Sequence, residues 1–170
     1  MGYMFSVSIK GQKQGVFKGE GSTQSKLKDK IVGLSFSYEV KSPRDAASGQ
    51  ASGKRQHSPI KIVKEWGAAT PQIFQALITN EALPEVTLEF RRTNATGEEY
   101  VYHRIKLTNA SVSEIRQFSA DDSLQGSSSA KHGTSGDYRQ MEEVSFTFQK
   151  IDIANLDAKT EALDDWHTGG

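Results

Sequence analysis

The stretch TPQIFQALITNEALPEVTLEFRR, residues 70–92, combines one helix with one strand and outlines the fold. Thr70 has a side chain that can cap the free N–H groups of a first helical turn. Pro71 suits the first helical position because its missing N–H costs nothing there. Asn80 tolerates the left-handed backbone conformation that closes a helix. These signals predict a helix over about Thr70–Asn80.

Within the same stretch the hydrophobic period changes from that of a helix to that of a strand. Apolar side chains recur at helical spacing and predict one face packed on a core; they are Ile73, Phe74, Leu77 and Ile78. From Val86 onward apolar and polar residues alternate, with Leu88 and Phe90 on the apolar side. A strand therefore follows the helix almost directly.

Alternating segments on both sides of this stretch predict that the rest of the chain is mainly β. The segments are Tyr3–Lys10, Leu34–Val40, Ile60–Trp66, Tyr100–Leu107, Val112–Phe118 and Val144–Phe148. Residues 94–97 carry Asn and Gly, which suit a hairpin turn between antiparallel strands. After Phe148 the apolar phase reverses, which predicts a bulge or bend near Gln149–Lys150, as at the corner of a barrel.

The strand predicted at residues 34–40 separates large apolar from small polar side chains. Leu34, Phe36 and Tyr38 share one face of it, and burying each is worth roughly 1.5–3 kcal/mol. That face is therefore expected to pack in the core. Ser35 and Ser37 are then expected to point outward.

Two long polar segments interrupt the strands. Lys41–His57 contains no large apolar residue, and Ala120–Gly136 is rich in Ser and Gly. Connections of this length inside a compact domain are usually either functional or disordered, and the sequence leaves both open. The acidic residues 154–170 are expected to form a short helix or a flexible tail, so we place residues 1–153 in one domain and the tail outside it.

Composition excludes several classes of protein. The chain has 170 residues, enough for one domain with a sizeable core, and no apolar run approaches the length of a membrane span. Its 21 basic and 21 acidic residues argue against a general nucleic-acid or anionic-membrane binder. It contains no cysteine, which excludes disulfides, thiolate zinc sites and cysteine nucleophiles. The N-terminus lacks the charged and apolar regions of a classical signal peptide.

No catalytic, metal or cofactor motif is recognisable. The four histidines share no ligand spacing; they are His57, His103, His132 and His167. The adjacent carboxylates at 121–122 and 164–165 lie in polar segments, where such residues are usually solvated or cap a turn. The segment at 126–131 resembles a phosphate-binding loop only faintly, because it lacks the second glycine before its lysine. We therefore expect no enzyme and no cofactor.

An oligonucleotide-binding barrel is an alternative with some support in the sequence. Basic and aromatic residues are adjacent in Phe90-Arg91-Arg92, as they are in Arg116-Gln117-Phe118. Phe90, however, belongs to the buried phase of its strand, and the net charge is zero. The sequence therefore favours a binding or assembly role that does not involve nucleic acid.

The order of these elements resembles the haemolysin-coregulated protein (Hcp) family, the tube proteins of bacterial type VI secretion. The resemblance rests on the helix-to-strand segment beginning Thr70-Pro71, on the closing segment GDYRQMEEVSFTFQKIDI, and on the Gly- and Ser-containing loop after Leu34–Val40. It extends in order from Tyr3 to about Ile153. No single motif is diagnostic, but the ordered set is fairly specific. A phage tail tube protein is the nearest alternative, and an unrelated lectin-like or enzyme domain is a more distant one.

The resemblance implies a mainly β fold: a small closed or nearly closed β-barrel of two packed sheets, flanked by one helix. It implies homohexameric rings that stack into a hollow tube, inside a contractile sheath and below a spike. Small effector proteins would be held and stabilised in the lumen. It also implies a bacterial cytoplasmic protein that is exported without a cleaved signal peptide and without insertion into a membrane.

The resemblance also gives expectations for particular residues. Ser35 and Ser37 are expected to face the lumen and its cargo, because small hydroxyls leave room for a passenger and offer adaptable hydrogen bonds. The loop after the second strand is expected to contact a neighbouring subunit or the next ring. Its candidate contact residues are Lys41, Ser42, Arg44, Asp45, Lys54 and Arg55.

Overall fold

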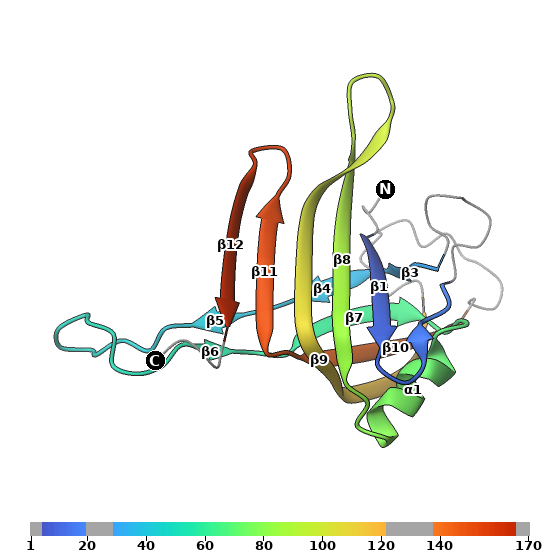
Figure 1. The fold of residues 1–170 in the computed structure, drawn as a ribbon, viewed down its shortest axis with the longest axis horizontal. Coiled ribbons are helices and arrows are strands. Elements are labelled where there is room, and N and C mark those ends of the chain that lie inside the picture. Colours follow the sequence, from blue (N-terminus) through green and yellow to red (C-terminus); the bar gives the residue numbers. More distant parts are fainter. Residues whose placement is uncertain (1–4, 20–28, 122–137, 166–170) are drawn as a thin grey trace.

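The computed structural model describes residues 5–19, 29–121 and 138–165, and it shows strands throughout with one helix (Figure 1). The elements in chain order are β1 (Phe5–Gly11), β2 (Gly15–Val16), β3 (Ile31–Gly33), β4 (Ser35–Ser37), β5 (Val40–Lys41), β6 (Gln56–His57), β7 (Ile60–Glu65), α1 (Thr70–Ile78), β8 (Leu83–Thr93), β9 (Glu99–Asp121), β10 (Tyr138–Thr147), β11 (Lys150–Asn155) and β12 (Thr160–Asp165). The mainly β fold with one flanking helix is confirmed.

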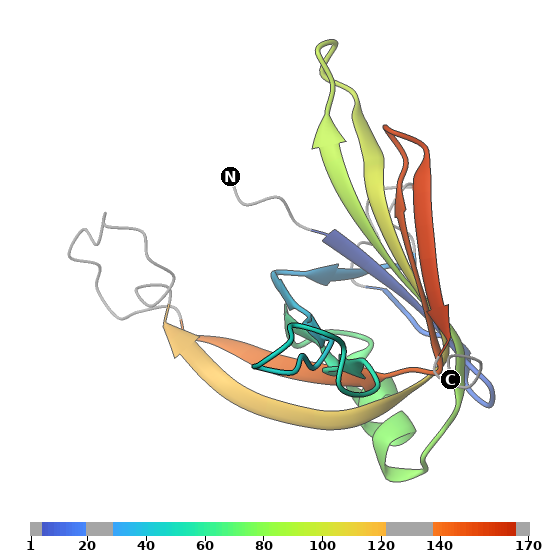
Figure 2. The same cartoon turned by 90° about the vertical axis from the view of Figure 1, so that its left-hand side faces the viewer.

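The long strand β9 belongs to two sheets. Its first half pairs with β8 on one side and β11 on the other, and its second half pairs with β10. The first sheet contains β1, β8, the first half of β9, β11 and β12; the second contains β4, β7, β10 and the second half of β9. The sheets face each other across the bend in β9 and do not close, which agrees with the expected nearly closed barrel (Figure 2).

The bend in β9 corrects the expectation of two separate strands at 100–107 and 112–118. Asn109 adopts a left-handed conformation with φ of 49°, yet the ladder continues on both sides of it. The predicted break after Phe148 is confirmed, since β10 ends at Thr147 and β11 begins at Lys150. There the Gln149 N–H donates to the carbonyl of Thr108, so the break lies against the bend in β9.

The core fills the space between the two sheets. Val7, Leu88 and Leu107 contribute to it from the first sheet, and Ile62 and Phe146 contribute from the second. All five are buried apolar side chains on alternating strand positions. Burial of this apolar surface is the main force that holds the sheets together.

Helix α1 begins and ends close to the predicted positions, but two details differ. Thr70 does not cap the helix: its hydroxyl accepts a hydrogen bond from the Gly67 N–H at 3.0 Å and donates to a buried carboxylate. Ile73 is buried as expected, whereas Phe74 and Ile78 are 52% and 56% exposed. The helix packs against the bend of β9 at one edge of the open barrel, so only part of its apolar face meets the core.

The carboxylate that Thr70 contacts belongs to a buried ion pair. Lys64 on β7 and Glu142 on β10 are register partners, and their side chains meet at 2.9 Å with no solvent exposure. The Lys64 ammonium also donates to the backbone carbonyl of Glu65 at 2.6 Å. The pair thus connects the second sheet to the start of α1.

Two other expectations need correction. Val40, predicted to lie on the buried face of its strand, is half exposed, and residues 34–40 form two short strands rather than one. The region after Ile153 is neither helical nor loose where it is described, because β12 pairs with β11. The domain boundary at residue 153 stays a prediction.

Most of the polar stretch Ala120–Gly136, together with His132 and His167, lies outside the described residues.

Candidate functional site

Ser35 and Ser37 lie on β4, where the predicted alternation holds. Both serines are exposed, and Phe36 between them packs against the core. β4 pairs with β7 only through these three residues, opposite Lys61, Ile62 and Val63. The serines therefore form a small polar surface on the outside of the second sheet, and their role toward a cargo stays a prediction.

The polar segment Lys41–His57 is a hairpin rather than an irregular loop. β5 and β6 pair at its base, and a bridge joins Arg44 to Ala51 further out. At the tip, the carboxylate of Asp45 accepts hydrogen bonds from the Ala47 N–H at 3.1 Å and from the Ser48 hydroxyl at 2.9 Å. These bonds lower the pKa of Asp45. The hairpin projects from the body of the molecule (Figure 1).

Five of the six predicted contact residues in this hairpin are exposed. They are Lys41, Ser42, Arg44, Asp45 and Lys54. Arg55 differs, because its guanidinium turns back to the C-terminal strand β12 and binds Asp164 in the same chain at 2.5 Å. The predicted residues thus all lie on one projecting hairpin, but Arg55 is bound to Asp164 of its own chain.

A hydrogen-bonded cluster that the sequence did not indicate lies at the base of the hairpin. The Tyr38 hydroxyl contacts Nδ1 of His57, and Nε2 of the same ring lies 2.6 Å from Asp164. The His57 side chain is only 4% exposed and packs against the edge of the Phe148 ring. His57 and Asp164 lie 107 residues apart, and no local pattern in the sequence connects them.

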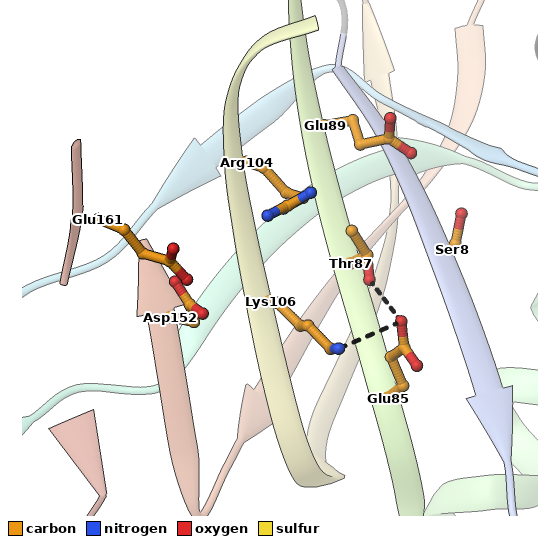
Figure 3. Close-up of a pocket in the computed structure, with 8 residues that line it drawn as sticks. All are labelled: Ser8, Glu85, Thr87, Glu89, Arg104, Lys106, Asp152 and Glu161. Atoms are coloured by element: carbon orange, nitrogen blue, oxygen red, sulfur yellow. Dashed lines mark hydrogen bonds and ion pairs between the residues drawn. The ribbon is translucent and has the colours of Figure 1, made fainter. Parts of the chain in front are cut away.

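A polar groove of about 540 Å³ lies on the outer face of the first sheet (Figure 3). It is lined by Ser8, Glu85, Thr87, Glu89, Arg104, Lys106, Asp152 and Glu161. These residues occupy the strand positions that alternate with the core, so the sequence could have identified most of them as one outward face. Three of the lining charges are partly neutralised by pairing, since Lys106 lies 3.9 Å from Glu85 and Glu89 is bound by Lys30 at 2.8 Å.

Two carboxylates meet at one end of this groove. Asp152 on β11 and Glu161 on β12 point toward each other (Figure 3). A hydrogen bond between them, and after it the negative charge of Asp152, raise the pKa of Glu161. Such a pair favours a shared proton over two adjacent negative charges.

The described residues contain no group of three or more His, Cys, Asp or Glu side chains that could hold a metal ion. Within the same residues, no helix has the length and apolar character needed to cross a membrane. The exposed features are an open polar groove, a serine pair on a strand and a projecting hairpin. These features suit contact with other macromolecules.

Comparisons with known proteins agree with one another. A family model described as type VI secretion system effector, Hcp, matches residues 7–154. The "Major exported protein" of Pseudomonas aeruginosa is 29% identical over 170 residues and covers 95% of this chain and 94% of its own length.

Solved structures show the same fold. A crystal structure of an Hcp protein superposes with a TM-score of 0.81 at 24% identity, covering 96% of this chain and 99% of the other. The secreted protein Hcp3 from Pseudomonas aeruginosa gives 0.73 at 26% identity, covering 96% and 98%. The first of these supports the fold alone, because its identity is low.

Proposed function

Since this chain belongs to the Hcp family of type VI secretion proteins, we propose that it is a structural subunit of the secreted tube. In this proposal six copies form a ring, the rings stack, and the lumen carries small effector proteins. The observation that carries the proposal is the family match over residues 7–154, together with a fold shared over nearly the whole chain.

The arrangement of the sheets supports ring formation. Among the described strands, β12 ends the first sheet and β4 ends the second, so each sheet presents an edge. Exposed strand edges attract other strands, and a closed ring covers them on every copy. A ring of identical interfaces also limits growth to a fixed number of subunits.

The hairpin Lys41–His57 supports contact between subunits or between rings. It projects from the body, and its exposed cations Lys41, Arg44 and Lys54 outnumber its one carboxylate, Asp45. Exposed acidic side chains lie at the β8–β9 turn, at Glu98 and Glu99. Opposite charges on two projecting segments of one chain can pair between neighbouring copies, where they would fix orientation more than they add affinity.

Ser35 and Ser37 are the proposed lumenal contacts for an effector. Both are small, exposed and hydroxyl-bearing, on a strand whose opposite face is anchored by Phe36 in the core. A rigid strand with short side chains leaves space for a passenger and still offers hydrogen bonds. No catalytic role follows from these features, and we propose a structural function without a cofactor.

The remaining partners follow from the family. The tube would meet a spike at its end and a contractile sheath around it, and it would leave the bacterial cytoplasm with them on contraction. The name of the Pseudomonas relative, "Major exported protein", supports export. The family match is to a secretion protein, which favours this proposal over a phage tail tube.

Light scattering coupled to size exclusion tests the ring directly. We expect a particle of about 112 kDa, six times the 18.7 kDa of one chain. Electron microscopy of the same fraction should show rings with a central hole. A stable monomer at micromolar concentration would contradict the proposed ring.

A further inference from the structure

The hairpin described above, taken here from the first residue of β5 as Val40–His57, projects from the body of the molecule. It lies at the end of the molecule where β12 finishes (Figure 1). Its own strands contribute only short pairings, two residues in β5 with two in β6. A two-stranded hairpin is at best marginally stable by itself. Its orientation therefore depends on what holds its base.

Side-chain hydrogen bonds join the base of the hairpin to β12. The Asp164 carboxylate accepts from Arg55 Nε at 2.5 Å and meets His57 Nε2 at 2.6 Å through one oxygen, Oδ2. The second arm of the Arg55 guanidinium donates to the backbone carbonyl of Asp165 at 3.2 Å. Arg55 and His57 both belong to the returning arm of the hairpin, so β12 holds that arm at two points.

Tyr38, which lies between β4 and β5, completes the cluster. A neutral His57 ring that carries its proton on Nε2 donates to Asp164 and accepts the Tyr38 hydroxyl on Nδ1, so one tautomer satisfies all three groups. The Tyr38 and His57 rings also lie nearly parallel, with centroids 6.0 Å apart. Tyr38 thus joins the cluster through His57, while Arg55 and His57 of the returning arm contact the carboxylate itself.

The electrostatics of the cluster favour an ionised Asp164 carboxylate and a protonated Tyr38 phenol. The Arg55 guanidinium, and after it the His57 ring, hold the pKa of Asp164 below the ordinary range of an aspartate. Burial, with the nearby Asp164 charge, raises the pKa of Tyr38 to about 12, so the phenol keeps its proton. Charge-assisted hydrogen bonds of this kind are about twice as strong as neutral ones.

We propose that β12 acts as a clamp, through Asp164, that fixes the orientation of the hairpin Val40–His57 and thereby controls how firmly rings stack. The anchoring carboxylate lies beyond residue 154, where the family match ends. The control of ring stacking rests on the proposed tube function. The clamp between β12 and the hairpin does not.

The test compares Asp164→Asn with Asp157→Asn in otherwise intact protein. Both variants lose one carboxylate from the β11–β12 hairpin, but Asp157 lies in its turn and contacts Arg92 and Tyr100 instead. Amide hydrogen exchange is followed at Lys41 and Gln56, the register partners at the hairpin base. Asp164→Asn should accelerate their exchange at neutral pH by about tenfold or more, since it weakens hydrogen bonds to a charged group. Asp157→Asn should leave it unchanged.

Two further measurements complete the test. Tyr38→Phe removes only the hydroxyl and should accelerate the same amides to a smaller extent, which decides the clamp if Asp164→Asn fails to fold. Sedimentation then reports the fraction of stacked rings, which should fall for Asp164→Asn and not for Asp157→Asn. Unchanged exchange in both clamp variants would overturn the clamp, and faster exchange with unaltered stacking would overturn its control of assembly. A monomeric wild type would overturn the tube proposal, while the exchange rates would still decide the clamp.

Discussion

At the scale of single residues, the buried ion pair between Lys64 and Glu142 is the most consequential feature. Both side chains are fully buried, and one oxygen of Glu142 has no hydrogen-bond partner in the structure. Removing two charges from water is costly, and an incompletely bonded carboxylate offsets that cost poorly. The pair is therefore expected to specify how β7, β10 and the start of α1 fit together rather than to add much net stability.

Breaking this pair from one side should be far more harmful than replacing it. Glu142→Gln leaves the Lys64 charge buried beside a neutral amide, and we expect a loss of about 3–5 kcal/mol in the free energy of unfolding. The double variant Lys64→Met with Glu142→Leu should regain most of that loss, because no uncompensated charge remains. Urea unfolding monitored by tryptophan fluorescence measures both. A single variant within about 0.5 kcal/mol of wild type, as for an ordinary surface change, would refute this account.

Glu161 gives a prediction with a defined pH dependence. Its pKa is raised, first by the hydrogen bond with Asp152, so the stabilisation from the shared proton is present at acid pH and is lost as pH rises through the raised value. Glu161→Gln supplies an N–H donor at every pH and removes one of two like charges. We expect the variant to melt at a higher temperature than wild type at pH 7 and at the same temperature at pH 4.

The control for Glu161 is Glu98→Gln, which makes the same change in charge on an exposed turn. It should not alter the melting temperature at either pH. If the advantage of Glu161→Gln persisted at pH 4, the shared proton would not be its cause.

At the scale of elements, the hairpin Val40–His57 separates into an anchored base and a free outer part. Arg55 and His57 bind β12, whereas the outer residues bond mainly to one another, as in the turn around Asp45. This division allows the outer part to be removed without disturbing the anchor. It also distinguishes contacts made by the tip from the effect of the clamp.

Replacing Ser42–Gly53 with a short Gly-Ser linker should leave the ring intact and weaken the stacking of rings. The replaced segment carries Arg44 and Asp45 but none of the residues of the base cluster. Size exclusion with light scattering should again give about 112 kDa, while sedimentation should show fewer stacked rings. Arg44→Gln alone, which keeps the segment but removes its one cation, shows whether charge pairing causes the effect. Unchanged stacking in the linker variant would mean that the tip is a surface excursion with no part in assembly.

At the scale of the whole molecule, two sheets share one bent strand, β9, and the barrel that they form is open. Their outer faces differ in character. The first sheet carries the charged groove, and the second carries the serine surface of β4. A ring built from such subunits can present one of these faces to its lumen and the other to its surroundings.

Ser37→Gln tests which face meets the cargo. The change adds bulk without charge at an exposed position, where substitutions usually alter stability by no more than about 0.5 kcal/mol. We expect the variant to form rings and to lose co-purification of a lumenal effector. Thr160→Gln, an equally exposed change on β12, should retain the effector. Wild-type affinity in Ser37→Gln would show that Ser37 does not line the cargo site.

Local patterns along the chain predicted the class of the fold, the helix α1 and most of the described strands. Alternation of apolar residues and turn chemistry depend on residues that are close along the chain. They can therefore be recognised without the structure. Ser35 and Ser37 were placed correctly on an outward face for this reason. The phase reversal after Phe148 likewise indicated the break that separates β10 from β11.

The long-range pairings, in contrast, follow from the way the sheets pack in the folded chain. The sequence predicts a gap between two strands near Asn109, but β9 continues through it. The reason is that β8, β10 and β11 pair with β9 on the two sides of this residue. Phe74 is exposed because α1 lies at the edge of the open barrel. Asp164 meets His57 because β11 returns the chain along the first sheet and β12 then ends beside the hairpin. Contacts between residues so far apart depend on how the sheets pack, and no local period in the sequence encodes them.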